Sequence, residues 1–242
     1  HPVSISLKYH WIPASSGSLA YVGFWLDSIS AIMLVVVSGV ALAVQVYSLG
    51  YMSHESKQSL GRYFTYHSLF ATSMLGLVLA NNFLQVYIFW ELVGVCSYLL
   101  IGFWYYKPEA AKAAVKAFWV TRFGDMGLII GIILLWGNTG TFDYQETFAL
   151  VENGQIPFGI LTLVSVLMLM GAFGKSAQFP FHVWLPDAME GPTPVSALIH
   201  AATMVAAGVY LVIRLFPIFS AVPTALEILT YVGSFTALLA AT

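Results

Sequence analysis

The stretch PFGILTLVSVLMLMGAFGKSAQFPFHVWLPDAM, residues 157–189, decides how this chain can fold. It is apolar for about 33 residues, and one helix of that length would be ~50 Å long, well beyond the ~30 Å hydrocarbon core of a bilayer. Pro180 and Pro186 interrupt it, and each removes a backbone donor and clashes with the preceding turn. We expect a broken helix, with a membrane half ending near Gln178 and a short half at 182–188. In transporters such breaks often mark an ion site.

The whole chain has the composition of a membrane protein. Of its 242 residues, 59% are hydrophobic and 8% are charged, against roughly 25% charged in an average soluble protein. The net charge of −2 excludes the basic patch that nucleic-acid binding requires. The single cysteine, Cys96, excludes a disulfide framework and a zinc or iron–sulfur site on this chain alone. Because the chain opens with His1 and closes inside an apolar run, we expect an excerpt of a longer membrane protein.

Seven apolar segments are each close to the ~20 residues needed to cross a bilayer. Helices are expected, because an open β-edge does not survive in lipid and these runs lack the alternation of barrel strands. The predicted fold class is an all-α membrane protein with about seven transmembrane helices, one of them broken, in a single transmembrane domain over residues 1–242. The expected spans are 23–47, 62–80, 83–104, 117–136, 158–179, 194–216 and 224–242.

Seven alternating spans divide the basic residues between two sides of the membrane. Since basic residues favour the cytoplasm, the side with five of them is expected there, and the N-terminal segment faces outward. The cytoplasmic group is Lys57, Arg62, Lys107, Lys112 and Lys116. The opposite group is Lys8 and Arg214, together with the acidic loop of Asp143, Glu146 and Glu152.

Glu91 and Lys175 are the strongest candidates for a functional site, because an ionisable side chain at bilayer depth costs about 2.5–3.5 kcal/mol. Nothing within four residues of Glu91 neutralises it, so its partner lies on another helix or it is protonated. We favour a proton site or counter-ion over a carboxylic acid bonded to backbone. Lys175 follows Gly171 and Gly174, which admit close neighbours or water, and moving a nearby carboxylate would switch its protonation. The alternative is a lysine that snorkels to the interface.

Four further ionisable residues lie inside the spans. Arg122 and Asp125 are spaced to pair on one helix face, and we expect an internal ion pair, with competition of Asp125 for another base as the alternative. His200 suits a proton relay, because histidine titrates near neutral pH, and a histidine that is merely hydrogen-bonded is the alternative. Asp27 is expected to anchor a helix N-terminus. Haem is not expected, because the only other histidine clearly inside a span is His67.

Three blocks of sequence, in order, carry a family resemblance. The first is FWELVGVCSYLLIGF at 89–103, and the second is KAF at 116–118 with TRFGD at 121–125. The third comprises GKSAQ at 174–178, WLPDAM at 184–189 and GPTPVSALIHAATMV at 191–205. Together they resemble the antiporter-like membrane subunits of respiratory complex I, and most closely the subunit 5 (chain L) type. Multi-subunit cation/proton antiporters share much of this pattern.

The resemblance implies a fold of two inverted five-helix repeats, each with one broken helix. Residues 62–216 would be the first repeat and residues 224–242 the start of the second.

The resemblance also implies roles for the candidate site residues. The family's proton path uses a glutamate and a broken-helix lysine, which match Glu91 and Lys175, and continues through a histidine that matches His200. The positions of Arg122 and Asp125 would modulate it.

The implied function is proton translocation within NADH:quinone oxidoreductase, driven by quinone reduction elsewhere in the complex. This chain would carry no redox catalysis, no cofactor and no metal. Expected partners are the other membrane-arm subunits, the lipid bilayer and an internal water chain, without nucleic acid. The expected location is the bacterial plasma membrane, with an organellar energy-transducing membrane as the alternative. The rival functions are the large subunit of a multi-subunit cation/proton (Na⁺/H⁺) antiporter and a purely structural membrane subunit.

Overall fold

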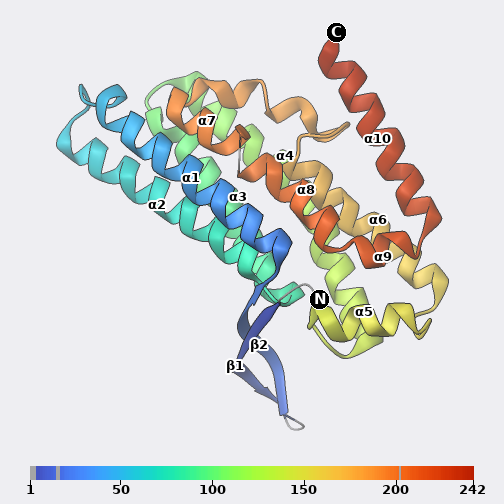
Figure 1. Cartoon of the computed structure of the whole chain (residues 1–242). Helices are drawn as coiled ribbons and strands as arrows, with labels where there is room; N and C mark the ends of the chain where they lie inside the picture. The colour runs from blue at the N-terminus through green and yellow to red at the C-terminus, as the bar shows by residue number, and fades with distance from the viewer. Residues whose placement is uncertain (1–3, 15–16, 202) are drawn as a thin grey trace.

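The computed structural model describes residues 4–14, 17–201 and 203–242. These residues form a bundle of α-helices with one β-hairpin at its end, so the expected helical membrane architecture is confirmed (Figure 1). Within the described ranges, six helical stretches are long and apolar enough to cross a membrane. The span expected at 62–80 is a helix of 23 residues, but it is not one of those six.

The long helices match the predicted spans closely, apart from their ends. They are α1 (Ser28–Tyr51), α2 (Lys57–Leu79), α3 (Phe83–Ile101), α4 (Pro108–Thr139), α6 (Phe158–Lys175) and α10 (Pro223–Ala241). The shorter helices are α5 (Tyr144–Glu152), α7 (Thr193–Ala201), α8 (Met204–Arg214) and α9 (Phe216–Ser220). Three short 3₁₀ turns are η1 (Gly102–Trp104), η2 (Phe181–Trp184) and η3 (Asp187–Glu190).

The N-terminal segment is an antiparallel hairpin, which the sequence reasoning missed. Strand β1 (Ile5–Ala14) pairs with β2 (Gly17–Leu26), and Figure 1 shows the hairpin projecting from one end of the bundle. The prediction that the first span begins at 23 was therefore wrong. The helix begins only at Ser28, because Asp27 caps it by accepting a hydrogen bond from the Ser30 N–H at 2.9 Å.

Side chains from the helix ends fasten the hairpin to the bundle. Asn82 donates to the carbonyl of Tyr21 at 2.9 Å, and Lys8 pairs with Asp143 at 2.6 Å. The second contact places Lys8 and the acidic loop at the same end of the molecule, as the predicted grouping requires. Which end faces the cytoplasm stays a prediction.

The broken helix is confirmed, but its second half differs from the expectation. Helix α6 ends at Lys175, three residues before Gln178, and Ala177 adopts a left-handed backbone with φ 50°. The predicted short helix is instead the two 3₁₀ turns η2 and η3, packed against α4. Two prolines six residues apart leave too few backbone donors for a regular α-helix.

The sixth predicted span, 194–216, is confirmed as a candidate membrane span at Thr193–Arg214, but it is divided into two helices. Helix α7 ends at Ala201 and α8 begins at Met204, and residue 202 lies outside the described residues. At the junction, the Thr203 hydroxyl donates to the carbonyl of Leu198 at 2.5 Å. The end of α7 and the start of α8 thus lie within a few residues of His200.

Candidate functional site

A buried ion pair joins the end of α6 to the middle of α4. The Lys175 Nζ lies 3.0 Å from Asp125 Oδ2, and the two side chains are 1% and 2% exposed. The indole N–H of Trp90 on α3 donates to the other carboxylate oxygen, Oδ1, at 2.6 Å. Both oxygens of Asp125 are thus engaged, and the alternative of a snorkelling lysine was wrong.

Glycines on α3, α4 and α6 make room for this pair. A Cβ on Gly94 would lie 2.7 Å from the Lys175 Nζ, so the lysine occupies the space where a side chain at 94 would stand. A Cβ on Gly124 would lie 2.7 Å from the carbonyl oxygen of Met170 and 3.2 Å from the Gly174 Cα. The close approach of α4 and α6 therefore depends on Gly124, the residue next to Asp125.

A second pair of opposite charges lies between α3 and α4. Arg122 Nη1 is 2.5 Å from Glu91 Oε2, and the side chains are 31% and 17% exposed. This pair is more accessible than the first, and Arg122 also lies over the ring of Phe118, with 4.9 Å between Cζ and the ring centroid. Glu91 is also within electrostatic reach of Asp125 and Lys175. The expectation that Glu91 needs a partner from another helix is confirmed.

The predicted pairing of Arg122 with Asp125 was wrong. The two residues share α4 at the expected i, i+3 spacing, but each carboxylate and each base pairs across helices instead. The available partners explain why Asp125 pairs with Lys175 and not with Arg122. Among the described residues, Lys175 has no other carboxylate within ion-pair distance, whereas Arg122 reaches the more exposed Glu91. Four ionisable groups on three helices thus form two adjacent pairs.

His200 lies on α7, apart from both ion pairs. Its two ring nitrogens are buried and have no hydrogen-bond partner among the described residues. Trp184 connects the two regions, because its indole N–H donates to the carbonyl of Gly174 at 3.0 Å and its ring centroid lies 6.0 Å from that of His200. The structure thus brings Glu91, Arg122, Asp125 and Lys175 together and leaves His200 one side chain away.

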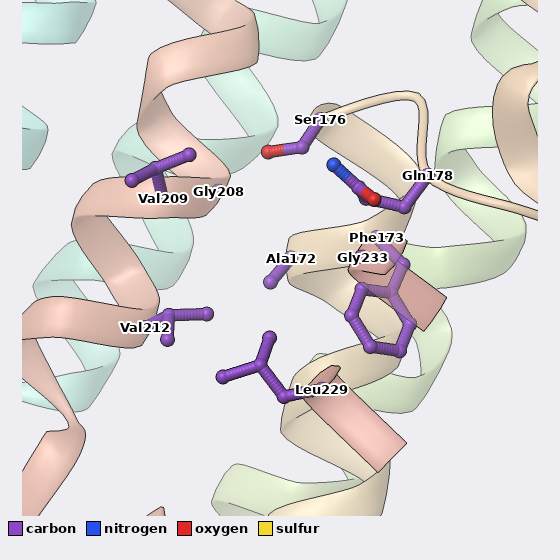
Figure 2. A pocket seen from close by; sticks show the side chains of 9 residues that line it. All are labelled: Ala172, Phe173, Ser176, Gln178, Gly208, Val209, Val212, Leu229 and Gly233. Carbon is purple, nitrogen blue, oxygen red and sulfur yellow. The ribbon is translucent and has the colours of Figure 1, made fainter. Parts of the chain in front are cut away.

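A cavity of about 130 Å³ opens beside the break, between α6, α8 and α10 (Figure 2). Its lining is mostly apolar, with Ser176 and Gln178 as its polar members. Ser176 donates to the carbonyl of Val205 at 2.7 Å, and the side-chain oxygen of Gln178 is buried with no partner among the described residues. Gly208 keeps α8 close, since a Cβ there would lie 2.4 Å from the Ala172 carbonyl oxygen.

Asp27 has the predicted helix-capping role and a further one that was missed. Arg214, at the end of α8, contacts both of its carboxylate oxygens, at 2.6 and 3.0 Å. Burial raises the pKa of Asp27, but the bonds from Arg214 and from the Ser30 N–H outweigh that effect and lower it below its ordinary value. A buried arginine at the end of a predicted span needs a carboxylate partner, so the sequence could have predicted that Arg214 pairs with an acidic residue.

His67 is buried, and its Nδ1 lies 3.2 Å from the side-chain nitrogen of Gln45 on α1. Over the described residues, no three His, Cys, Asp or Glu side chains gather as metal ligands. That the chain carries no cofactor stays a prediction.

Comparison with known proteins identifies two matching family models. The one described as "NADH:quinone oxidoreductase/Mrp antiporter, TM" matches residues 80–242. The one described as "NADH-Ubiquinone oxidoreductase (complex I), chain 5 N-terminus" matches residues 11–64.

Two similar curated proteins come from photosynthetic lineages. The chloroplastic NAD(P)H-quinone oxidoreductase subunit 5 of Anthoceros angustus is 52% identical over 97% of this chain and 32% of its own length. NAD(P)H-quinone oxidoreductase chain 5 of a Synechocystis strain is 52% identical over 99% of this chain and 35% of its own. This chain thus spans about a third of these relatives.

A solved structure shares the fold. It is a chain in the Mrp complex from Dietzia sp. DQ12-45-1b, with a TM-score of 0.80 and 37% identity over 88% of this chain and 23% of that one.

Proposed function

Since the chain belongs to the NADH:quinone oxidoreductase/Mrp antiporter transmembrane family, we propose that it is a proton-translocating membrane subunit of an NAD(P)H–quinone oxidoreductase. The two relatives at 52% identity, both named as subunit or chain 5 of that oxidoreductase, support the assignment. One observation of the structure carries it: the fully buried Asp125–Lys175 pair at the helix break, beside the half-buried Glu91–Arg122 pair. Ionisable groups are costly inside a membrane protein, and those that occur there commonly mark ion or proton pathways.

The Asp125–Lys175 pair is the proposed proton-holding element. Asp125 supplies the negative charge that compensates the buried ammonium of Lys175. At ~4 Å and an effective dielectric of ~20, one such pair is worth about 4 kcal/mol. Withdrawing Asp125 would remove that stabilisation and favour release of the proton from Nζ.

Arg122 is the proposed modulator of this element. It lies one helical turn from Asp125 on α4 and pairs with Glu91. If Glu91 takes up a proton or moves, Arg122 loses its partner and becomes free to attract Asp125. Asp125 then has two competing bases, so a change at the more exposed pair alters the charge of the buried one.

The proton would leave Lys175 toward His200. Trp184 bridges the two regions, and the unpartnered nitrogens of His200 offer both a donor and an acceptor. The cavity beside Ser176 and Gln178 has room for water close to the break. In this proposal the site residues are Glu91, Lys175 and His200 as proton carriers.

The proposed partners are the other membrane-arm subunits of the oxidoreductase, and the redox chemistry takes place on them. Several apolar helices make the chain an integral membrane protein. The relatives come from a cyanobacterium and from chloroplasts. They therefore support an energy-transducing membrane in general and do not single out the bacterial plasma membrane expected from the sequence.

A cation/proton antiporter subunit is the second candidate, and the structural similarity to a chain of the Mrp complex favours it. The same buried pairs would serve an exchange driven by ion gradients instead of redox energy. The two candidates differ in what drives the proton.

The test uses inside-out membrane vesicles that carry the full-length protein in its assembled complex. Wild type is compared with Lys175→Met, and with Lys112→Met as a matched loss of one exposed lysine. On adding NADH in sodium-free buffer, wild type and Lys112→Met should acidify the lumen, and Lys175→Met should do so at least tenfold more slowly, since the lost group is worth more than 1.4 kcal/mol. Acidification that needs a sodium pulse and ignores NADH would point to the antiporter. Unimpaired pumping by Lys175→Met would contradict both.

A further inference from the structure

A groove between α2, α3 and α4 is lined by none of the proposed proton carriers, although Phe118 at its far end contacts Arg122. Its wider part is a cavity of about 280 Å³ near the η1 turn. Its lining combines aromatic, aliphatic and basic side chains. Among them are Arg62, Tyr66, Tyr98, Phe103, Tyr105 and Val115. The mouth is open, because Tyr105 is 65% exposed and Val115 is 46% exposed.

Arg62 is held at this mouth without a carboxylate partner among the described residues. Its Nη2 donates to the carbonyl of Phe103 at 3.4 Å, and its Cζ lies 5.0 Å from the ring centroids of Phe103 and Tyr105. A guanidinium has five donors, so most of its capacity stays free. Contacts with these two rings hold the guanidinium in place, and its remaining donors are available to an anion.

The acidic and basic side chains nearby make contacts outside the groove. Glu55 accepts the indole N–H of Trp104 at 2.9 Å. On another face of α4, Lys116 pairs with Asp187 at 2.6 Å, and Lys112 shares its surroundings with Glu109 and Glu190. Of the residues that line the groove, Arg62 alone is charged.

The groove continues along α4 as an apolar channel. A second cavity of about 190 Å³ is lined by Tyr98, Val115, Phe118 and Trp119, and it shares Tyr98 and Val115 with the first. From Ala111 to Trp119, α4 rises ~12 Å, which is the direction an acyl chain would take from the headgroup level into the bilayer. Trp119 at its far end is 66% exposed.

We propose that this groove binds an anionic phospholipid, with the phosphate on Arg62 and one acyl chain along Val115 and Trp119. A bidentate arginine–phosphate contact suits the fixed guanidinium, and the tyrosine hydroxyls around it can donate to the remaining oxygens. Basic pockets between transmembrane helices on the cytoplasmic side are where anionic headgroups bind. This site does not depend on the proposed proton pathway.

The test uses the full-length protein in its assembled complex, in vesicles of phosphatidylcholine with a minor share of phosphatidylglycerol. In turn, each lipid carries a photoreactive acyl chain, and the labelled peptides are mapped. Phosphatidylglycerol should label residues 98–119 about tenfold more than phosphatidylcholine at equal amounts, as expected for one charge-assisted contact. Arg62→Gln should abolish that preference, while Lys57→Gln, which removes a charge on the same helix end outside the groove, should change it less than twofold.

A second variant, Val115→Trp, fills the channel without altering charge and should also reduce the labelling. Several outcomes would overturn the proposal: equal labelling by both lipids, unchanged labelling in an assembled Arg62→Gln complex, or no labelling of the groove because a neighbouring subunit covers it. Displacement of the lipid by millimolar inorganic phosphate would likewise show that a free ion is the occupant.

Discussion

At the scale of single residues, the charge on Lys175 depends on very few atoms. One carboxylate oxygen of Asp125 lies 3.0 Å away, Trp90 holds the other oxygen, and Gly94 leaves the space that Nζ fills. With both charged side chains almost completely buried, no bulk water screens the pair. Small displacements of Nζ therefore change its energy greatly.

Gly94→Ala should slow proton transport about tenfold without removing any charge. The new Cβ would lie 2.7 Å from the Lys175 Nζ, so the ammonium has to retreat from its site. Losing a third of a ~4 kcal/mol pair already amounts to about tenfold in rate. Pumping by the assembled complex is the measurement.

The matched control for this variant is Gly39→Ala on α1, where a Cβ meets nothing within 4 Å. It should pump at the wild-type rate. If Gly94→Ala pumps as fast as wild type, the close contact between Gly94 and Lys175 does not matter for proton transport.

At the scale of elements, the contact between α4 and α6 decides whether the buried pair forms. Gly124 lets the α4 backbone approach Met170 and Gly174, which brings the adjacent Asp125 within reach of Lys175. Helix α6 must also end at Lys175, because the break frees the backbone there and Trp184 returns to bond the carbonyl of Gly174. The packing of α4 against α6 and the break after Lys175 together bring Asp125 and Lys175 into contact.

Gly124→Ala should push α4 and α6 apart. The added Cβ would meet the Met170 carbonyl oxygen at 2.7 Å, and backbone atoms cannot give way as a flexible side chain does. We expect a loss of about 1–3 kcal/mol in stability, seen as a lower melting temperature of the purified complex, together with slower pumping.

Gly137→Ala, on the same helix and with nothing within 4 Å of its Cβ, should match wild type in both assays. An unchanged melting temperature in Gly124→Ala would show that the helix contact is looser than described.

At the scale of the whole molecule, the Asp27–Arg214 pair ties distant parts of the chain together. Asp27 starts α1 and Arg214 ends α8, and Arg214 also donates to Ser30 at 2.6 Å. The hydroxyl of Tyr210 adds α2 to the cluster by donating to the carbonyl of Val78 at 2.7 Å. This junction closes the end of the bundle from which the hairpin projects.

Asp27→Asn should destabilise the assembled protein by about 3 kcal/mol at neutral pH, because it leaves the 2% exposed Arg214 side chain without a counter-charge. The pKa of Asp27 is lowered in the folded state. Its stabilising contribution is therefore complete above the ordinary pKa of ~3.9 and is lost as pH falls through the lowered value.

Thermal melting of wild type and Asp27→Asn between pH 8 and pH 3 is the measurement. The difference between them should stay constant down to about pH 5 and shrink below pH 4. A difference that varies between pH 8 and pH 6 would mean that another group controls this junction.

From the sequence alone, the membrane class, the limits of most spans and the helix break were predictable, and the same reasoning singled out the ionisable residues that are proposed as the site. These follow from local chemistry: apolar length, prolines and the cost of charge in lipid are readable from neighbouring residues. The family resemblance was equally local, since it rests on contiguous motifs.

Which charges pair could not be read from the sequence and depends on how the helices pack. The spacing of Arg122 and Asp125 allowed an ion pair on α4. Because α4 packs closely against α6, Asp125 pairs with Lys175 instead, and Arg122 pairs with Glu91. The hairpin, the split of the sixth span at Thr203 and the Asp27–Arg214 junction were also beyond the local pattern. Each of these features depends on contacts between residues far apart in the chain. The energy of an ion pair depends on the burial of the two groups and the distance between them, and the spacing of residues along one helix defines neither.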